Sequence, residues 1–264
     1  MDPHSLAPAP APGGPLAGLG VLVTRPARQA GPFAAKLAAL GATPVIFPAI
    51  AILPPDDTAP LAAVHAALER YDFAVFVSAN AAEYGVRPGR PWPSRVTALA
   101  PGPGTAEALA ALGVADARIP ATTFDSEGLL ALPLLADVRG RRVVIFRGDG
   151  GREELPEALR SRGAEVDIVA CYRRAAPASV AGLDEAFAAG RIDAVTLTSS
   201  EGIDNLWPRL AEGARAAWRR CPSFVPHPRI AAHARQLGLA VVDTAGGDAG
   251  LVAGLLEWAP KRPH

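Results

Sequence analysis

An arginine followed by a glycine-rich turn occupies the stretch 143–155, which reads VVIFRGDGGREEL. The apolar residues predict a buried strand that ends at Arg147, and the turn 148–151 leads into a helix that begins with two glutamates. Backbone N–H groups at such a turn, together with an arginine, are suited to an anion. Short glycine-rich turns are also common without a ligand, and taken alone this one is more simply an ordinary connection.

The other predicted strand ends carry the same residue types: hydroxyls, amides, glycines and arginines, with few acids. Such a set is suited to a ligand with several carboxylates or phosphates. Each Ser or Thr could instead cap a helix, and the two strand-end arginines could be solvated surface residues. The candidate binding residues are Arg25, Ser78, Asn80, Gly102, Pro103, Gly104, Thr105, Arg147, Gly148, Gly151, Arg152, Thr198, Ser199, Ser200, His227 and Arg229.

Two side chains could donate a proton. Tyr172 lies near the end of a long extended run, and its hydroxyl could face a ligand, although a packed aromatic is an equal alternative. His227 could be a general acid, but its counterpart at the repeat spacing described below is Gly102, so a ligand contact is the better interpretation. His65 and His233 fall on predicted helices and are interpreted as structural.

Several kinds of chemistry are excluded. The glycines at 102–104 do not complete a dinucleotide fingerprint, and the turn after Arg147 lacks the GK[ST] ending of a P-loop. Neither lysine, Lys36 or Lys261, is placed for a Schiff base, and the two isolated cysteines give no zinc site. No cofactor and no metal are expected.

Strands alternate with helices along nearly the whole chain, which predicts an α/β protein with parallel sheets whose function lies at the carboxyl ends of the strands. The predicted strand–helix units begin at 21, 71, 96, 143, 192, 223 and 240, and two long extended runs occupy 44–53 and 165–177.

Identical residues recur at a nearly constant spacing. Arg25 and Arg147 are 122 residues apart, and Ser78 and Ser199 are 121 apart. This favours a duplicated half-molecule, although any similarly spaced strand–helix series would show some agreement. The further pairs are Leu37 with Leu159, Gly41 with Gly163, Asp72 with Asp193, Pro103 with Pro228, Gly113 with Gly238, and Gly128 with Gly250.

Length and composition fit this organisation. The 264 residues suggest two domains, half of them are apolar, and 26 basic residues balance 26 acidic ones, which argues against a nucleic-acid or polybasic membrane binder. Residues 1–17 are rich in Pro, Ala and Gly and are expected to be a disordered tail without a signal peptide. No apolar run is long enough to span a membrane, and two isolated thiols fit a cytoplasmic protein.

With these residues collected, the chain resembles the uroporphyrinogen-III synthase family over about residues 19–258. The resemblance rests on the order and spacing of several motifs, each of which is a weak signal by itself. These are VLVTRP, DFAVFVSANA, GPGTAEAL, FRGDGGREELPEAL, VACYRR and LTSSEGIDNL.

The resemblance implies two flavodoxin-like or Rossmann-like α/β lobes with parallel sheets, joined by a two-stranded extended linker. The first lobe would be discontinuous, 18–48 plus 175–260, and the second would be 52–170. The linker strands would be 44–53 and 165–177.

The implied reaction closes hydroxymethylbilane, a linear tetrapyrrole with eight carboxylates, and inverts its last pyrrole ring through a spiro intermediate. Tyr172 aligns with the family's proposed acid for loss of the terminal hydroxyl, and binding would carry much of the catalysis. The resemblance also implies a small-molecule substrate, without nucleic acid or membrane. A transient handover from the preceding pathway enzyme and a monomer are expected.

One place departs from the family. Many members have a Gly-Pro-x-Thr-like loop where this chain reads His227-Pro228-Arg229-Ile230, without a hydroxyl. Arg229 could bind a substrate carboxylate there instead. A non-catalytic two-lobed anion-binding protein is the main alternative, and a Rossmann-type oxidoreductase is weakened by the missing fingerprint.

Overall fold

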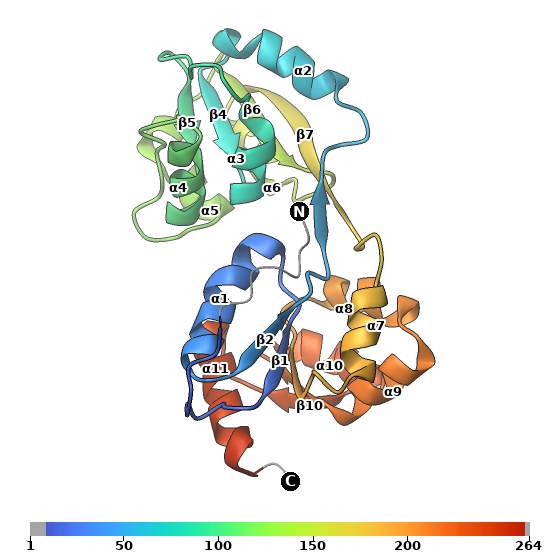
Figure 1. Cartoon of the computed structure of the whole chain (residues 1–264). Coiled ribbons are helices and arrows are strands. Elements are labelled where there is room, and N and C mark those ends of the chain that lie inside the picture. The colour runs from blue at the N-terminus through green and yellow to red at the C-terminus, as the bar shows by residue number, and fades with distance from the viewer. Residues whose placement is uncertain (1–8, 262–264) are drawn as a thin grey trace. The chain divides into compact units, whose positions relative to one another are not determined.

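The computed structural model describes residues 9–261. The chain divides into two compact units, which are treated separately: unit 1 comprises residues 1–51 and 175–264, and unit 2 comprises residues 52–174. Each unit contains a five-stranded sheet with helices packed against both faces, and every strand pair whose register is resolved is parallel (Figure 1). The α/β fold with two parallel sheets is confirmed.

Unit 1 has the strand order β10-β9-β8-β1-β2. Its strands are β1 Gly20–Val23, β2 Thr43–Ile46, β8 Ala194–Thr196, β9 Pro222–Val225 and β10 Ala240–Asp243. Its helices are α1 Ala27–Ala39, α7 Ala181–Ala188, α8 Ser200–Leu206, α9 Glu212–Arg220, α10 Pro228–Gln236 and α11 Gly247–Trp258. Short 3-10 helices follow α8, at Trp207–Arg209, and α11, at Ala259–Lys261.

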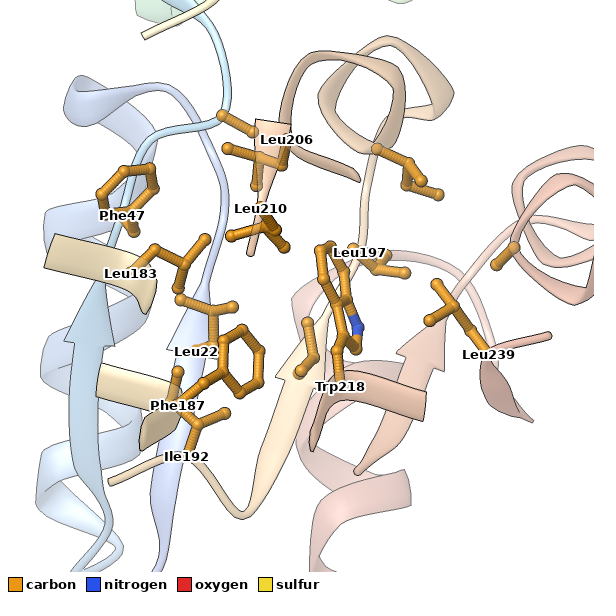
Figure 2. Close-up of a cluster of buried hydrophobic side chains, with 14 of the residues drawn as sticks. Leu22, Phe47, Leu183, Phe187, Ile192, Leu197, Leu206, Leu210, Trp218 and Leu239 are labelled. Atoms are coloured by element: carbon orange, nitrogen blue, oxygen red, sulfur yellow. The ribbon is translucent and has the colours of Figure 1, made fainter. Parts of the chain in front are cut away.

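Alternation along the strands of unit 1 places apolar side chains on both faces of the sheet. Leu22 of β1 belongs to a cluster built with α7 to α10, in which Trp218 is fully buried beside Leu197 (Figure 2). The neighbouring residues Val21 and Val23 belong to a second cluster, with α1 and α11. Burial on both faces explains the continuous apolar letters of the strands.

Unit 2 has the strand order β3-β7-β6-β4-β5. Its strands are β3 Ala51–Leu53, β4 Phe73–Phe76, β5 Thr97–Leu99, β6 Arg142–Gly148 and β7 Glu165–Ala175. Its helices are α2 Ala59–Ala66, α3 Ala79–Gly85, α4 Pro103–Ala111, α5 Ser126–Leu130 and α6 Glu154–Ser161, with 3-10 turns at Leu68–Arg70 and Pro133–Leu135.

The two units share one strand order at the repeat spacing. β2, β1, β8 and β9 correspond to β7, β6, β4 and β5, and the position of β10 corresponds to a parallel bridge between Leu99 and Arg118. Matching hydrogen bonds accompany this order. Asp72 Oδ2 accepts from the N–H of Arg142 at 2.9 Å, and Asp193 Oδ2 accepts from the N–H of Gly20 at 2.7 Å. β3 is the addition that has no counterpart in unit 1.

The run 44–53 is not one linker strand. β2 ends at Ile46 in the sheet of unit 1, and β3 begins at Ala51 in the sheet of unit 2. Pro48 lies between them and has no N–H to continue a ladder, so the run is divided at this point. The chain returns to unit 1 after Arg174, one residue before β7 ends at Ala175.

The expectation of a disordered tail over 1–17 is wrong for residues 9–17, and residues 1–8 lie outside the described part. Leu16 is fully buried in the cluster with α1 and α11. The N–H groups of Ala11 and Leu16 donate to the carbonyls of Ala38 and Leu40, which satisfies the end of α1. A buried leucine and two backbone hydrogen bonds thus hold this Pro/Ala/Gly-rich segment against the core.

Candidate functional site

A pocket of about 270 Å³ lies at the carboxyl ends of β6 and β7, within unit 2. Five of the sequence-predicted residues line it together: Arg147, Gly148, Gly151, Arg152 and Tyr172. The remaining lining residues are Val77, Ser126, Ile145, Asp149, Gly150, Leu155, Pro156 and Arg174.

Tyr172 is buried, and its hydroxyl lies 3.3 Å from Oγ of Ser78. Ser78 caps α3 by accepting the N–H of Ala81 at 3.1 Å, so the predicted cap and the predicted site residue are the same side chain. The Tyr172 ring packs directly on Gly148, where a Cβ atom would lie 2.8 Å from two ring carbons. Gly148 is therefore required by the close approach of the tyrosine.

Arg147 is only 17% exposed and reaches over its own loop. Its Nη2 pairs with Glu153 at 2.8 Å, and its Nη1 donates to the carbonyl of Arg152 at 3.2 Å. Gly150 and Gly151 adopt φ values of 75° and 146°, which side-chain-bearing residues rarely adopt. The glycine-rich turn thus allows the loop to fold back beneath the guanidinium.

Cys171 adjoins the pocket but is not a nucleophile. The side chain is buried, and its Sγ lies 3.3 Å from the carbonyl oxygen of Arg147. Burial raises the pKa of the Cys171 thiol to about 12, so the thiolate is absent near neutral pH.

The other predicted residues of unit 2 do not line this pocket. Asn80 is half-buried in the first turn of α3. The GPGT residues begin α4, where Gly102 lies against Phe124 and Thr105 is buried. Pro103 and Gly104 are exposed.

In unit 1, the strand-end arginine is already paired. Arg25 Nη1 donates to Asp248 Oδ1 at 2.5 Å, and the guanidinium lies 4.3 Å from the centre of the Phe33 ring. Partial burial of Asp248 opposes ionisation, yet the hydrogen bonds from Arg25 and Lys36 lower the pKa of its carboxyl below the ordinary value. Arg25 is therefore already engaged by a carboxylate of the protein, and its contact with a ligand stays a prediction.

The candidate residues of unit 1 that carry hydroxyls lie around the start of α8. Ser199 caps α8 by accepting the N–H of Gly202 at 3.3 Å, while Thr198 and Ser200 are half-buried at the start of that helix. Ligand contact by these residues stays a prediction.

His227 caps α10, because its Nδ1 accepts the N–H of Arg229 at 3.2 Å. The departure from the family's loop therefore puts a capping imidazole at the position of the family's glycine, and Ile230 at the position of its threonine. Arg229 is exposed on the first turn of this helix, and its contact with a ligand stays a prediction.

Eight of the residues that line the pocket are not among the sequence-predicted ones, and they include Ser126, Leu155 and Arg174. The repeat spacing carried a usable signal for two of these, because it relates Ser126 to Asp248 and Leu155 to Phe33.

Two other pockets lie away from these residues. One of about 500 Å³ in unit 1 is lined by Gly20, Thr43 and Asp193, and one of about 660 Å³ in unit 2 is lined by His65, Arg70 and Trp92. Both lie towards the amino ends of their strands, whereas parallel α/β sheets bind ligands at the carboxyl ends. The smaller pocket at Arg147 is therefore the better candidate despite its size.

Between residues 9 and 261, no group of three metal-ligating side chains comes together. In the same range, no helix is both long and apolar enough to cross a membrane.

Comparisons with known proteins agree with one another. A family model described as "Uroporphyrinogen-III synthase HemD" matches residues 31–247. The chain is 35% identical over 241 residues to the uroporphyrinogen-III synthase of Salmonella typhimurium. These aligned residues cover 88% of this chain and 98% of that protein. It is 34% identical over 241 residues to that of Escherichia coli, with the same coverage.

Solved structures show the same fold. A mutant uroporphyrinogen III synthase from the extremely thermophilic bacterium Thermus thermophilus superposes with a TM-score of 0.51 at 21% identity, covering 93% of this chain and 100% of that one. The synthetase from Helicobacter pylori 26695 superposes with a TM-score of 0.52 at 11% identity, covering 92% and 98% of the two chains.

Proposed function

Because the chain belongs to the uroporphyrinogen-III synthase family, we propose that it acts as a hydro-lyase that converts linear hydroxymethylbilane to uroporphyrinogen III. The reaction releases the terminal hydroxyl as water, inverts the last pyrrole ring and closes the macrocycle. The observation that carries this proposal is the pocket of unit 2, in which an arginine and a glycine-rich loop adjoin a buried tyrosine.

Binding a flexible polyanion is the first task. Arg147 is one of three arginines that line the pocket, with Arg152 and Arg174, and its guanidinium presents N–H donors in a plane that matches a carboxylate. Its present partner Glu153 has a side chain that is 48% exposed, and an ion pair so exposed contributes about 1 kcal/mol or less. A substrate carboxylate can therefore replace it at small cost.

Tyr172 supplies the proton. Its phenol protonates the departing hydroxyl while the C–O bond breaks, and the electron pair of that bond leaves with water. The pyrrole nitrogen electrons stabilise the resulting azafulvene cation, which the last pyrrole ring attacks to form the spiro intermediate. The proton that is lost when the macrocycle closes returns to the phenolate of Tyr172. Proton donation of this kind contributes about 10²–10⁴-fold to the rate.

The site requires no cofactor in this scheme, because the substrate's own pyrrole nitrogens stabilise the cation. The chain is expected to act as a monomer in the cytoplasm, where its two free thiols would stay reduced. The substrate would be received transiently from the enzyme that makes it.

The test is the isomer of the product. Purified protein is given freshly prepared hydroxymethylbilane, and the oxidised products are resolved chromatographically. Uroporphyrin III is expected in excess of the type I isomer that forms by spontaneous closure. Type I alone would contradict the proposed activity.

A further inference from the structure

The surroundings of Arg25 and Arg147 are related residue by residue through the repeat. Asp248 in unit 1 corresponds to Ser126 in unit 2 at the spacing of 122. The glycines two positions later show that this match is structural. A Cβ atom on Gly250 would lie 2.0 Å from the carbonyl oxygen of Ala245, and one on Gly128 would lie 1.7 Å from that of Thr123.

In unit 1 the protein itself supplies an anion at this position. The Asp248 carboxylate accepts from Arg25 Nη1 at 2.5 Å and from Lys36 Nζ at 3.1 Å. Phe33 packs beneath the guanidinium of Arg25. Arg25 therefore already holds a carboxylate.

In unit 2 the counterparts of these three side chains are uncharged, and Arg147 pairs instead with Glu153 of its own loop at 2.8 Å. Ser126 stands in place of the carboxylate, Leu155 in place of the Phe33 ring, and Ala158 in place of Lys36. Ser126, Leu155 and Arg147 all line the pocket of about 270 Å³. The same backbone arrangement thus leaves room beside the arginine of unit 2.

We infer that one carboxylate of the substrate occupies the space between Ser126 and Arg147, at the position that the Asp248 carboxylate fills beside Arg25. The inference rests on the proposed function for the identity of the ligand. Arg147 pairs with the carboxylate, and the Ser126 hydroxyl donates a hydrogen bond to it. Serine is suited to this position because it is small and adds no negative charge that would repel the ligand.

The test places a carboxylate on unit 2 by the substitution Ser126→Asp. The introduced group would pair with Arg147 and repel the incoming carboxylate. Ser126→Asn is the matched control, because asparagine has nearly the same shape without the charge. The probe is uroporphyrin III, the stable oxidised form of the product, and its dissociation constant is measured by fluorescence titration at fixed ionic strength.

Ser126→Asp is expected to raise the dissociation constant about tenfold, the effect of losing one charge-assisted hydrogen bond. Ser126→Asn is expected to raise it by about twofold or less, because the loss is a neutral hydrogen bond. With turnover measured in parallel, Ser126→Asp raises KM and leaves kcat within about twofold. The melting temperature of the Asp variant should equal or exceed that of the Asn variant, since only the former pairs with Arg147.

Equal dissociation constants for the Asp and Asn variants would overturn the inference, because size and not charge would then decide binding. No binding of uroporphyrin III by any of the three proteins would overturn it as well. These outcomes can be told apart from a failure of the proposed function. That failure would appear as type I isomer alone in the products of the unaltered chain. The charge difference in porphyrin binding does not depend on turnover.

Discussion

The hydroxyl of Tyr172 lies 3.3 Å from Oγ of Ser78, although the two residues are 94 positions apart in the chain. Ser78 Oγ also accepts the N–H of Ala81, which holds it at the start of α3. The ring centre of Tyr84 lies 6.1 Å from that of Tyr172, and Gly148 also packs against the Tyr172 ring. The phenol is therefore held in one orientation by a helix cap and by close packing.

Removing the phenolic oxygen should lower kcat without unfolding the protein. Tyr172→Phe keeps the ring on Gly148 but cannot donate a proton, so kcat for type III product should fall about 10²-fold or more. Initial rates are measured by resolving the porphyrin isomers. Unchanged kcat would remove Tyr172 from the mechanism.

Tyr84→Phe is the matched control for that substitution. The Tyr84 hydroxyl donates to the carbonyl of Ile52 at 2.8 Å and does not line the pocket. Its loss should lower stability by about 1 kcal/mol and leave kcat unchanged.

Arg147→Ala should weaken substrate binding more than it harms folding. The Glu153 side of the lost ion pair is 48% exposed, so stability should fall by about 1 kcal/mol or less. KM for hydroxymethylbilane should rise about tenfold or more, since a charge-assisted contact is lost. Thermal melting and steady-state kinetics measure the two effects.

Arg141→Ala serves as the comparison, because Arg141 also pairs with a carboxylate, Asp72, but at the amino end of β6. Its KM should match that of the unaltered chain. A normal KM together with a lowered melting temperature for Arg147→Ala would contradict a binding role.

Asp248→Asn should destabilise unit 1 in a pH-dependent manner. The folded pKa of Asp248 lies below its ordinary value, so the ionised carboxylate stabilises the fold at neutral pH. This contribution is complete above the unfolded pKa of about 3.9 and is lost as the pH falls through the lower folded pKa. Denaturant unfolding of both proteins between neutral and acidic pH measures the difference, which should shrink below about pH 4. A difference that is constant or grows towards acid would refute this linkage.

Thiol reagents should spare Cys171 in the native protein. Its pKa of about 12 leaves essentially no thiolate at neutral pH, and the side chain is buried. Cys221 is half-buried, and burial also raises the pKa of its thiol, so it should react slowly but before Cys171. Mass spectrometry after alkylation follows both residues, with the urea-unfolded protein as the control. Rapid labelling of Cys171 in the native protein would contradict this expectation.

Local patterns predicted most of the fold. Apolar runs of strand length alternate with helical spacing, and the repeat of 122 residues matches the shared strand order of the two sheets. Ser78 and Ser199 cap helices at related positions, as hydroxyls after a strand indicate. The tail was mispredicted because composition does not reveal that Leu16 reaches the core.

The sequence by itself determined the strands, the caps and the loop types, because these depend on residues within a few positions of one another. It also indicated arginines and hydroxyls at the carboxyl ends of the strands. Only the tertiary structure decided which of them have partners. Arg25 meets Asp248 across 223 positions, whereas Arg147 pairs with Glu153 of its own loop and lines a pocket with Ser126. Such long-range contacts follow from how the packed helices bring distant segments together, so two arginines at the same position of the repeat differ in their partners.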